Sequence, residues 1–132
     1  MRKITTTKAR PAAAALTAVA AVSLLSGCGW PDTARAEPDT TTFPFDGDVL
    51  DVVAEGTRTD LVPTDRTDVR VTRWIDAWGD PGVTSTWSLE EGTLRLENSC
   101  SGVCVYEDRF RVEVPTGVRV LRDGEPTDLT GR

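Results

Sequence analysis

The chain has 132 residues, with 15 Lys and Arg against 21 Asp and Glu, three cysteines and no histidine. The lack of histidine excludes Ser/His or Cys/His nucleophilic catalysis and a His-ligated zinc site. The acidic surplus argues against a nucleic acid or an anionic lipid surface as partner, because affinity for phosphate depends on Lys and Arg.

The first 27 residues have the pattern of an export signal. Residues 1–10 carry four basic residues and no acidic one, and residues 12–25 are almost entirely Ala, Val and Leu. This apolar run is shorter than the roughly 20 residues that cross a bilayer. It has the length of the apolar region of a signal peptide, so we expect residues 1–27 to be removed on export.

The sequence Leu25-Ser26-Gly27-Cys28 ends the apolar run and resembles the processing box of bacterial lipoproteins. The resemblance implies cleavage before Cys28 and a lipid on the Cys28 thiol, and two acyl chains suffice for stable anchoring. It predicts a location on the outer face of the bacterial cytoplasmic membrane, with ordinary secretion as the alternative. The remaining chain would hold 11 Arg, no Lys and 21 acidic residues, a net charge of −10.

Residues 28–42 are rich in Pro, Thr and Asp and have no apolar periodicity. This composition predicts a disordered tether between the lipid and a single folded domain over residues 43–132.

From residue 43 onward, short runs of β-forming residues are separated by turn residues. We expect one hairpin between residues 49–54 and 57–62 across Glu55-Gly56, and another between residues 84–89 and 93–98 across Glu90-Glu91-Gly92. Residues 76–82 are expected to form a connection, because Pro and Gly exclude a central strand.

Alternation of apolar and polar residues predicts which side chains face the core. Two expected strands show this alternation most clearly. Residues 68–75 have Val69, Val71, Arg73 and Ile75 on one face. Residues 108–114 have Phe110, Val112 and Val114 on one face. No segment of ten or more residues after the signal has a helical period. The sequence therefore predicts an all-β domain, a small antiparallel sheet or sandwich of short strands.

The segment RFRVEVPTGVRV (residues 109–120), preceded by TLRLENSCSGVC, resembles an adhesin-like family of bacterial surface proteins of largely unknown function. The likeness covers about residues 50–122 and implies short strands stacked in a β-solenoid-like sheet. The chain departs from the family pattern where the stacked repeats would begin, since only ten residues follow Arg122. We therefore expect a relative truncated after its first strands.

Cys100 and Cys104 are the best-defined pair of reactive side chains. A tight turn brings such cysteines within disulfide distance, and an exported domain meets an oxidising compartment. The spacing is not that of a redox pair, and no Lys or His nearby would activate a thiolate. We expect a structural disulfide.

Trp74 and Trp78 are the candidate ligand-binding residues, because an exposed aromatic face suits a sugar ring. Trp87 is expected in the core instead. Asp46, Asp48 and nearby Asp51 lack the Gly and Glu of an EF-hand loop, so a solvated acidic loop is favoured and no metal or other cofactor is expected.

These features favour a lipid-anchored, non-catalytic interaction or structural domain. The alternatives are a carbohydrate or cell-wall binding module that uses Trp74 and Trp78, and a small hydrolase that uses paired carboxylates. The strand Val118–Arg122 is expected to be a free edge that a partner protein or a second copy extends, unless residues 49–53 or blunting charges cover it.

Overall fold

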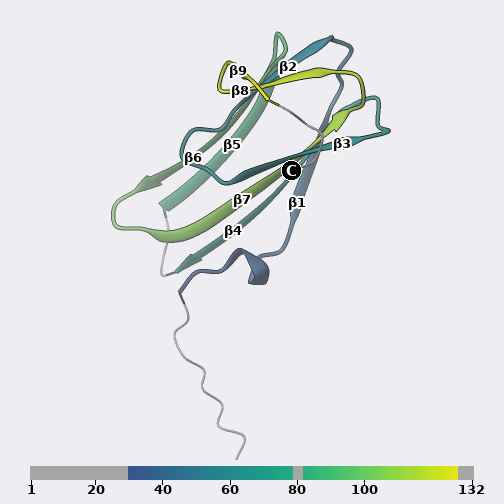
Figure 1. Cartoon of the computed structure of the whole chain (residues 1–132). Coiled ribbons are helices and arrows are strands. Elements are labelled where there is room, and N and C mark those ends of the chain that lie inside the picture. Colours follow the sequence, from purple (N-terminus) through teal and green to yellow (C-terminus); the bar gives the residue numbers. More distant parts are fainter. Residues whose placement is uncertain (1–29, 79–81, 128–132) are drawn as a thin grey trace, which may run out of the picture.

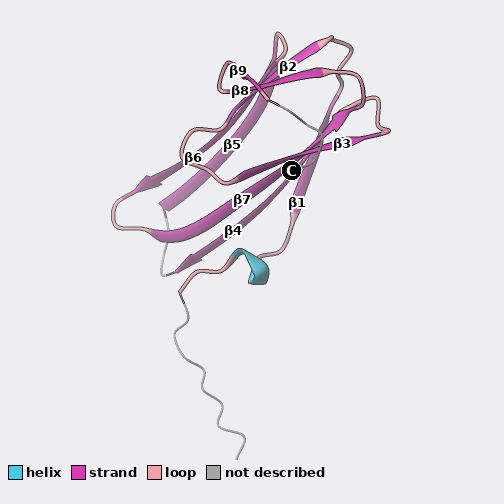
Figure 2. Ribbon diagram, viewed as in Figure 1, coloured by secondary structure: helices cyan, strands magenta, loops and turns pink. Residues whose placement is uncertain are grey.

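The structure is a computed structural model that describes residues 30–78 and 82–127, and in it two β-sheets pack face to face (Figures 1 and 2). Sheet A contains, from edge to edge, β1 (Asp39–Phe43), β4 (Val69–Trp78), β7 (Val105–Pro115) and β3 (Thr59–Thr64). Sheet B contains β5 (Gly82–Glu90), β6 (Thr93–Ser101), β2 (Val49–Val53), β8 (Arg119–Arg122) and β9 (Glu125–Pro126). The predicted all-β class is confirmed.

Within the described residues, the only helix is the three-residue 3₁₀ helix η1 (Thr33–Arg35), and no helix there is long and apolar enough to cross a membrane. The expected signal peptide and Cys28, the expected site of lipidation, lie outside the described residues.

The core lies between the two sheets, where the alternating apolar side chains of both sheets meet. Phe110, Val112 and Val114 of β7 are fully buried, as the alternation predicted, and so is Val71 of β4. The facing side chains from sheet B are Leu50, Val52, Leu94, Leu96 and Val120. Trp87 packs partly buried against this cluster, in agreement with its expected place in the core.

The predicted hairpin across Glu90-Glu91-Gly92 is confirmed, with Glu90 in the strand and a turn of two residues, Glu91 and Gly92. Leu89 pairs with Leu94 and Glu90 with Thr93 in an antiparallel register. The two turn residues have φ angles of 49° and 78°, the left-handed conformation that a tight hairpin turn requires at both positions.

The predicted hairpin across Glu55-Gly56 is wrong. Strand β2 lies in sheet B, parallel to β6 and β8, whereas β3 lies in sheet A, parallel to β7. Only Gly56 has a positive φ, 73°, so the turn does not have the geometry that joins two neighbouring strands of one sheet. The chain crosses from one sheet to the other here, and the sheets are mixed rather than purely antiparallel.

The disordered tether predicted for residues 28–42 is wrong for residues 33–35 and 39–42. Residues 39–42 belong to β1, which pairs antiparallel with β4, and residues 33–35 form η1. Three successive β-branched threonines favour a strand, and Asp39 pairs with Arg73 at 2.6 Å. Residues 28 and 29 lie outside the described residues.

The connection predicted for residues 76–82 is also partly wrong. Strand β4 continues to Trp78, which pairs with Val105, and β5 begins at Gly82. Strand β4 reaches this far because β7 supplies pairing partners for Ala77 and Trp78, even though turn-forming residues follow Trp78 in the sequence. Residues 79–81 lie outside the described residues.

Strand β8 is not the free edge that the sequence predicted. It lies between β2, with Leu50 opposite Val120, and β9, with Arg122 opposite Glu125. The alternative pairing with residues 49–53 is therefore the observed one. Asp123 secures it, because its N–H donates to the carbonyl oxygen of Val52 and its carboxylate accepts from the N–H of Ala54, both at 3.0 Å.

Candidate interaction surface

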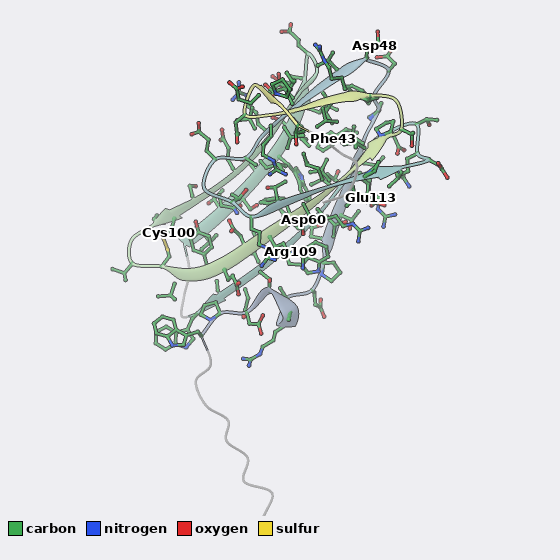
Figure 3. The ribbon with its side chains drawn as sticks, in the orientation of Figure 1. Phe43, Asp48, Asp60, Cys100, Arg109 and Glu113 are labelled. Carbon is green, nitrogen blue, oxygen red and sulfur yellow. A yellow bond between two sulfur atoms is a disulfide. The ribbon has the colours of Figure 1, made fainter. Side chains whose placement is uncertain are left out.

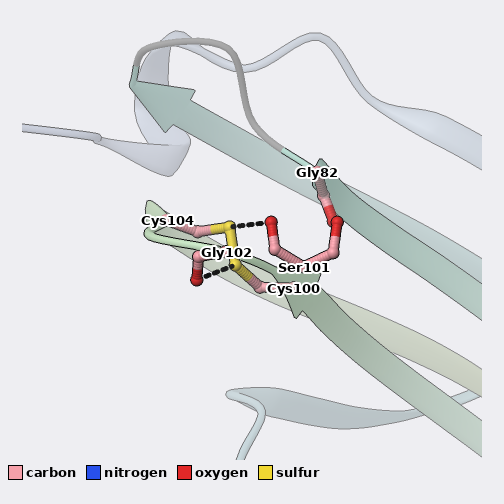
Figure 4. The surroundings of a disulfide bond; sticks show 5 residues. All are labelled: Gly82, Cys100, Ser101, Gly102 and Cys104. Atoms are coloured by element: carbon pink, nitrogen blue, oxygen red, sulfur yellow. Dashed lines mark hydrogen bonds between the residues drawn. A yellow bond between two sulfur atoms is a disulfide. The ribbon is translucent and has the colours of Figure 1, made fainter.

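Cys100 and Cys104 form a disulfide that closes the connection between β6 and β7, with the two Cα atoms 6.2 Å apart (Figure 4). Gly102, at the tip, has a φ of 92°, which a residue with a side chain rarely adopts. The bond agrees with the structural disulfide expected from the sequence. It fixes a loop whose tip carries the exposed side chain of Val103.

Replacing both Cys100 and Cys104 with serine is expected to lower the free energy of unfolding by about 2 kcal/mol, because the reduced chain gains loop entropy on unfolding. Urea unfolding of the exported protein without reductant measures the difference. The same comparison in dithiothreitol is the control, in which the two proteins should coincide. Equal urea midpoints without reductant would show that the bond does not stabilise the fold.

Trp74 and Trp78 lie on the same face of β4, on the outer side of sheet A, since alternate residues of the strand face the core. Trp74 is half-buried, and the guanidinium carbon of Arg109 is 5.7 Å from the centre of its ring. Arg109 in turn donates to Asp60 at 2.6 Å, and Figure 3 shows these two residues near one another beside the sheet. One side of the Trp74 ring is therefore already in contact with a cation.

Asp76 separates the two tryptophans on this face, and the N-terminal segment binds to it. The backbone N–H of Asp32 donates to Asp76 Oδ2 at 2.7 Å. The next N–H, that of Thr33, donates to Glu107 Oε2 at 3.1 Å, and Glu107 lies directly across from Asp76 on β7. The segment thus docks on the outer face of β4 and β7, between the two predicted ligand-binding residues.

The Asp32 side chain completes this docked segment. Its Oδ1 accepts the N–H of Ala34 at 2.9 Å and so caps η1. The docking brings Trp30, two residues before Asp32, to the end of β4 where Trp78 lies. Because β-type or apolar periodicity is absent from residues 30–38, the sequence offered no signal for this arrangement.

A charged residue that the site prediction did not include lies between the sheets. Arg73 donates to Asp39 Oδ2 at 2.6 Å and to the backbone oxygen of Ser85 at 3.0 Å, and its guanidinium carbon is 3.9 Å from the centre of the Trp87 ring. The signal was present in the sequence, because the alternation placed this Arg on the face of Val69 and Val71. A charge at such a position needs partners when it is buried.

Beside Arg73 is a solvent-open hollow of about 310 Å³, lined by Glu37, Asp39, Arg73, Ile75, Val83 and Ser85. The buried Oγ of Ser85 has no hydrogen-bond partner among the described residues. Arg73 is already neutralised by Asp39, so its guanidinium is not a free cation for a ligand. We assign Arg73 a structural role.

The acidic loop before β2 does not assemble a metal site. Asp51 Oδ1 accepts the N–H of Gly124 at 3.0 Å. This hydrogen bond joins Asp51 to the turn after β8, and not to the segment that carries Asp46 and Asp48. Over residues 30–78 and 82–127, no group of three His, Cys, Asp or Glu side chains is placed to hold a metal ion.

The large apolar side chains that remain exposed gather at one end of the sandwich. Trp78 is 60% exposed, Trp30 78% and Val103 99%. Trp78 is opposite Val105, two residues after Val103, and Trp30 is held near β4 through Asp32. We call the end that carries Trp30, Trp78 and Val103 the apolar end. In comparisons with family models, curated proteins and solved structures, none matches this chain.

Proposed function

We propose that this protein is a bacterial lipoprotein, anchored through lipid on Cys28 to the outer face of the cytoplasmic membrane, whose domain is a non-catalytic interaction or structural module. The observation that carries the proposal is Leu25-Ser26-Gly27-Cys28 at the end of a basic and then apolar segment. The likeness of residues 109–120 to adhesin-like surface proteins supports the same location and names no ligand.

Two features of the domain support an extracytoplasmic place. The Cys100–Cys104 disulfide suits an oxidising compartment. The segment that docks on β4 and β7 also lies close to the proposed anchor, since Asp32 is four positions after Cys28. The non-catalytic part of the proposal rests on the absence of histidine and on a sandwich interior filled by apolar side chains.

A carbohydrate module that uses Trp74 and Trp78 is the second candidate, and the geometry gives it less support. Arg109 occupies one side of Trp74, and the docked N-terminal segment separates the two rings. A continuous platform for successive sugar rings is therefore not formed. A change in tryptophan fluorescence on titration with soluble peptidoglycan fragments would restore this candidate.

Cys28→Ala is expected to abolish incorporation of labelled palmitate and to release the protein from the membrane fraction, because the variant lacks the thiol that carries the lipid. Metabolic labelling followed by membrane fractionation measures both effects. The matched control is the double variant Cys100→Ser and Cys104→Ser, which should keep the label because it retains Cys28. Label on the Cys28→Ala protein would contradict the proposal.

A further inference from the structure

We propose that the domain is seated directly on the membrane, with Trp30, Trp78 and Val103 in contact with the lipid headgroup layer. This inference rests on the proposed lipidation of Cys28 and goes beyond it. A lipid anchor alone holds a domain near a membrane and leaves its orientation free. The apolar end supplies a surface that would fix the orientation.

The first observation is the chemistry of the exposed side chains. Trp30, Trp78 and Val103 are the large apolar residues left exposed in the described part of the chain, and all three belong to the apolar end. Indole rings have an apolar body and a polar N–H, and they favour the boundary between water and hydrocarbon. The disulfide between Cys100 and Cys104 holds the loop that carries Val103 in place.

The second observation is the position of the anchor along the chain. Only Gly29 separates Cys28 from Trp30, and two consecutive Cα–Cα steps span at most about 7 Å. Asp32 and Thr33 are hydrogen-bonded to Asp76 and Glu107, so the chain that follows the anchor is attached to the domain rather than free. Lipid on Cys28 would therefore bring the apolar end, and no other end, to the bilayer surface.

The third observation is the charge at the opposite end of the sandwich. The connections there, residues 44–48, 65–68 and 90–92, carry one basic residue, Arg66, and six acidic ones: Asp46, Asp48, Asp65, Asp68, Glu90 and Glu91. Anionic lipid headgroups repel such charges within about a Debye length, roughly 10 Å. Seating the apolar end on the bilayer directs these connections toward solvent, away from the repulsion. The carboxylates nearest the apolar end, those of Asp32, Asp76 and Glu107, each accept a backbone N–H of the docked segment.

The test uses the lipidated protein extracted from membranes, reconstituted into vesicles of phosphatidylcholine and phosphatidylglycerol whose acyl chains are brominated near the headgroup. Bromine quenches only tryptophans in contact with lipid. Two of the four tryptophans belong to the apolar end, so we expect about half of the emission to be lost relative to unbrominated vesicles. High salt should not restore the emission, since the contact is apolar.

Two matched variants show which rings are responsible. Trp30→Phe with Trp78→Phe should remove the quenched part of the emission, whereas Trp74→Phe should retain it. Vesicle flotation separates the two proposals. Two results would contradict contact between the apolar end and lipid without contradicting the anchoring. In the first, the protein floats with the vesicles and its emission is equal in both kinds of lipid. In the second, the emission is still quenched after both Phe substitutions. A protein that does not float contradicts the anchoring, and the seating with it.

Discussion

Phe110→Ala is expected to lower the free energy of unfolding by about 3–5 kcal/mol, which is the usual cost of removing a buried aromatic ring. Phe110 is fully buried on β7, where it lies between Thr59 of β3 and Arg73 of β4. The space left by the ring would be bordered by strands of both sheets and has little scope to collapse. Because small domains are stable by only about 5–15 kcal/mol, this loss is a large share of the total.

Urea unfolding followed by circular dichroism measures the effect of Phe110→Ala. The control is Val103→Ala, since Val103 is 99% exposed and its truncation should change stability by less than about 0.5 kcal/mol. If the two variants unfold at the same urea concentration, Phe110 is not at the centre of the core.

Arg73→Met is expected to cost about 2 kcal/mol, because it removes the guanidinium and keeps most of the apolar stem. The lost interactions are the charged hydrogen bonds to Asp39 and to the Ser85 carbonyl oxygen, and the contact with the Trp87 ring. These bonds link β1 and β4 of sheet A to β5 of sheet B, so their loss also loosens the two sheets at this side of the sandwich.

The matched control for Arg73→Met is Arg109→Met, which removes a second arginine with an acidic partner and a tryptophan neighbour. The Arg109 side chain is 43% exposed on the outer face of sheet A, and exposed ion pairs contribute at most about 1 kcal/mol. Thermal or urea unfolding of both variants compares the two sites. Equal decreases in the free energy of unfolding would show that Arg73, although it lies between the sheets, contributes no more to stability than Arg109.

Strand positions and faces followed from the sequence because they depend on local alternation. The pattern around Phe110, Val112 and Val114 predicted the inward face of β7, and Glu91-Gly92 predicted a hairpin whose φ angles match the required turn. Both signals are contained within a few consecutive residues. The class of the fold followed from the same signals.

Strand pairing over long distances did not follow. Leu50 pairs with Val120 and Leu61 with Val112, and nothing within either segment specifies a parallel partner so far along the chain. The free edge predicted at Val118–Arg122 is wrong, and the sequence offered the observed pairing with residues 49–53 only as an alternative. The predicted tether failed because the partners that order β1 and η1, among them Asp76 and Glu107, come from other strands.

The candidate site was predicted in part. Alternation correctly placed Trp74 on the outer face of β4, whereas Trp78 was expected in a loop and belongs to the strand. Neither signal carried information about Arg109 or about the segment that docks between the two rings. The arrangement of Trp30 beside the end of β4 depends on that same docking. The exposure of an aromatic ring depends on its neighbours in space. These neighbours are often distant along the chain, so a single sequence does not identify them.

Mass spectrometry of the N-terminal peptide of the protein extracted from membranes tests the proposed anchoring most directly. We expect a peptide that begins at Cys28 and carries the added mass of a diacylglycerol on its thiol, with residues 1–27 removed. An N-terminal peptide that retains residues 1–27, or one that begins at another residue and has an unmodified Cys28, would contradict it.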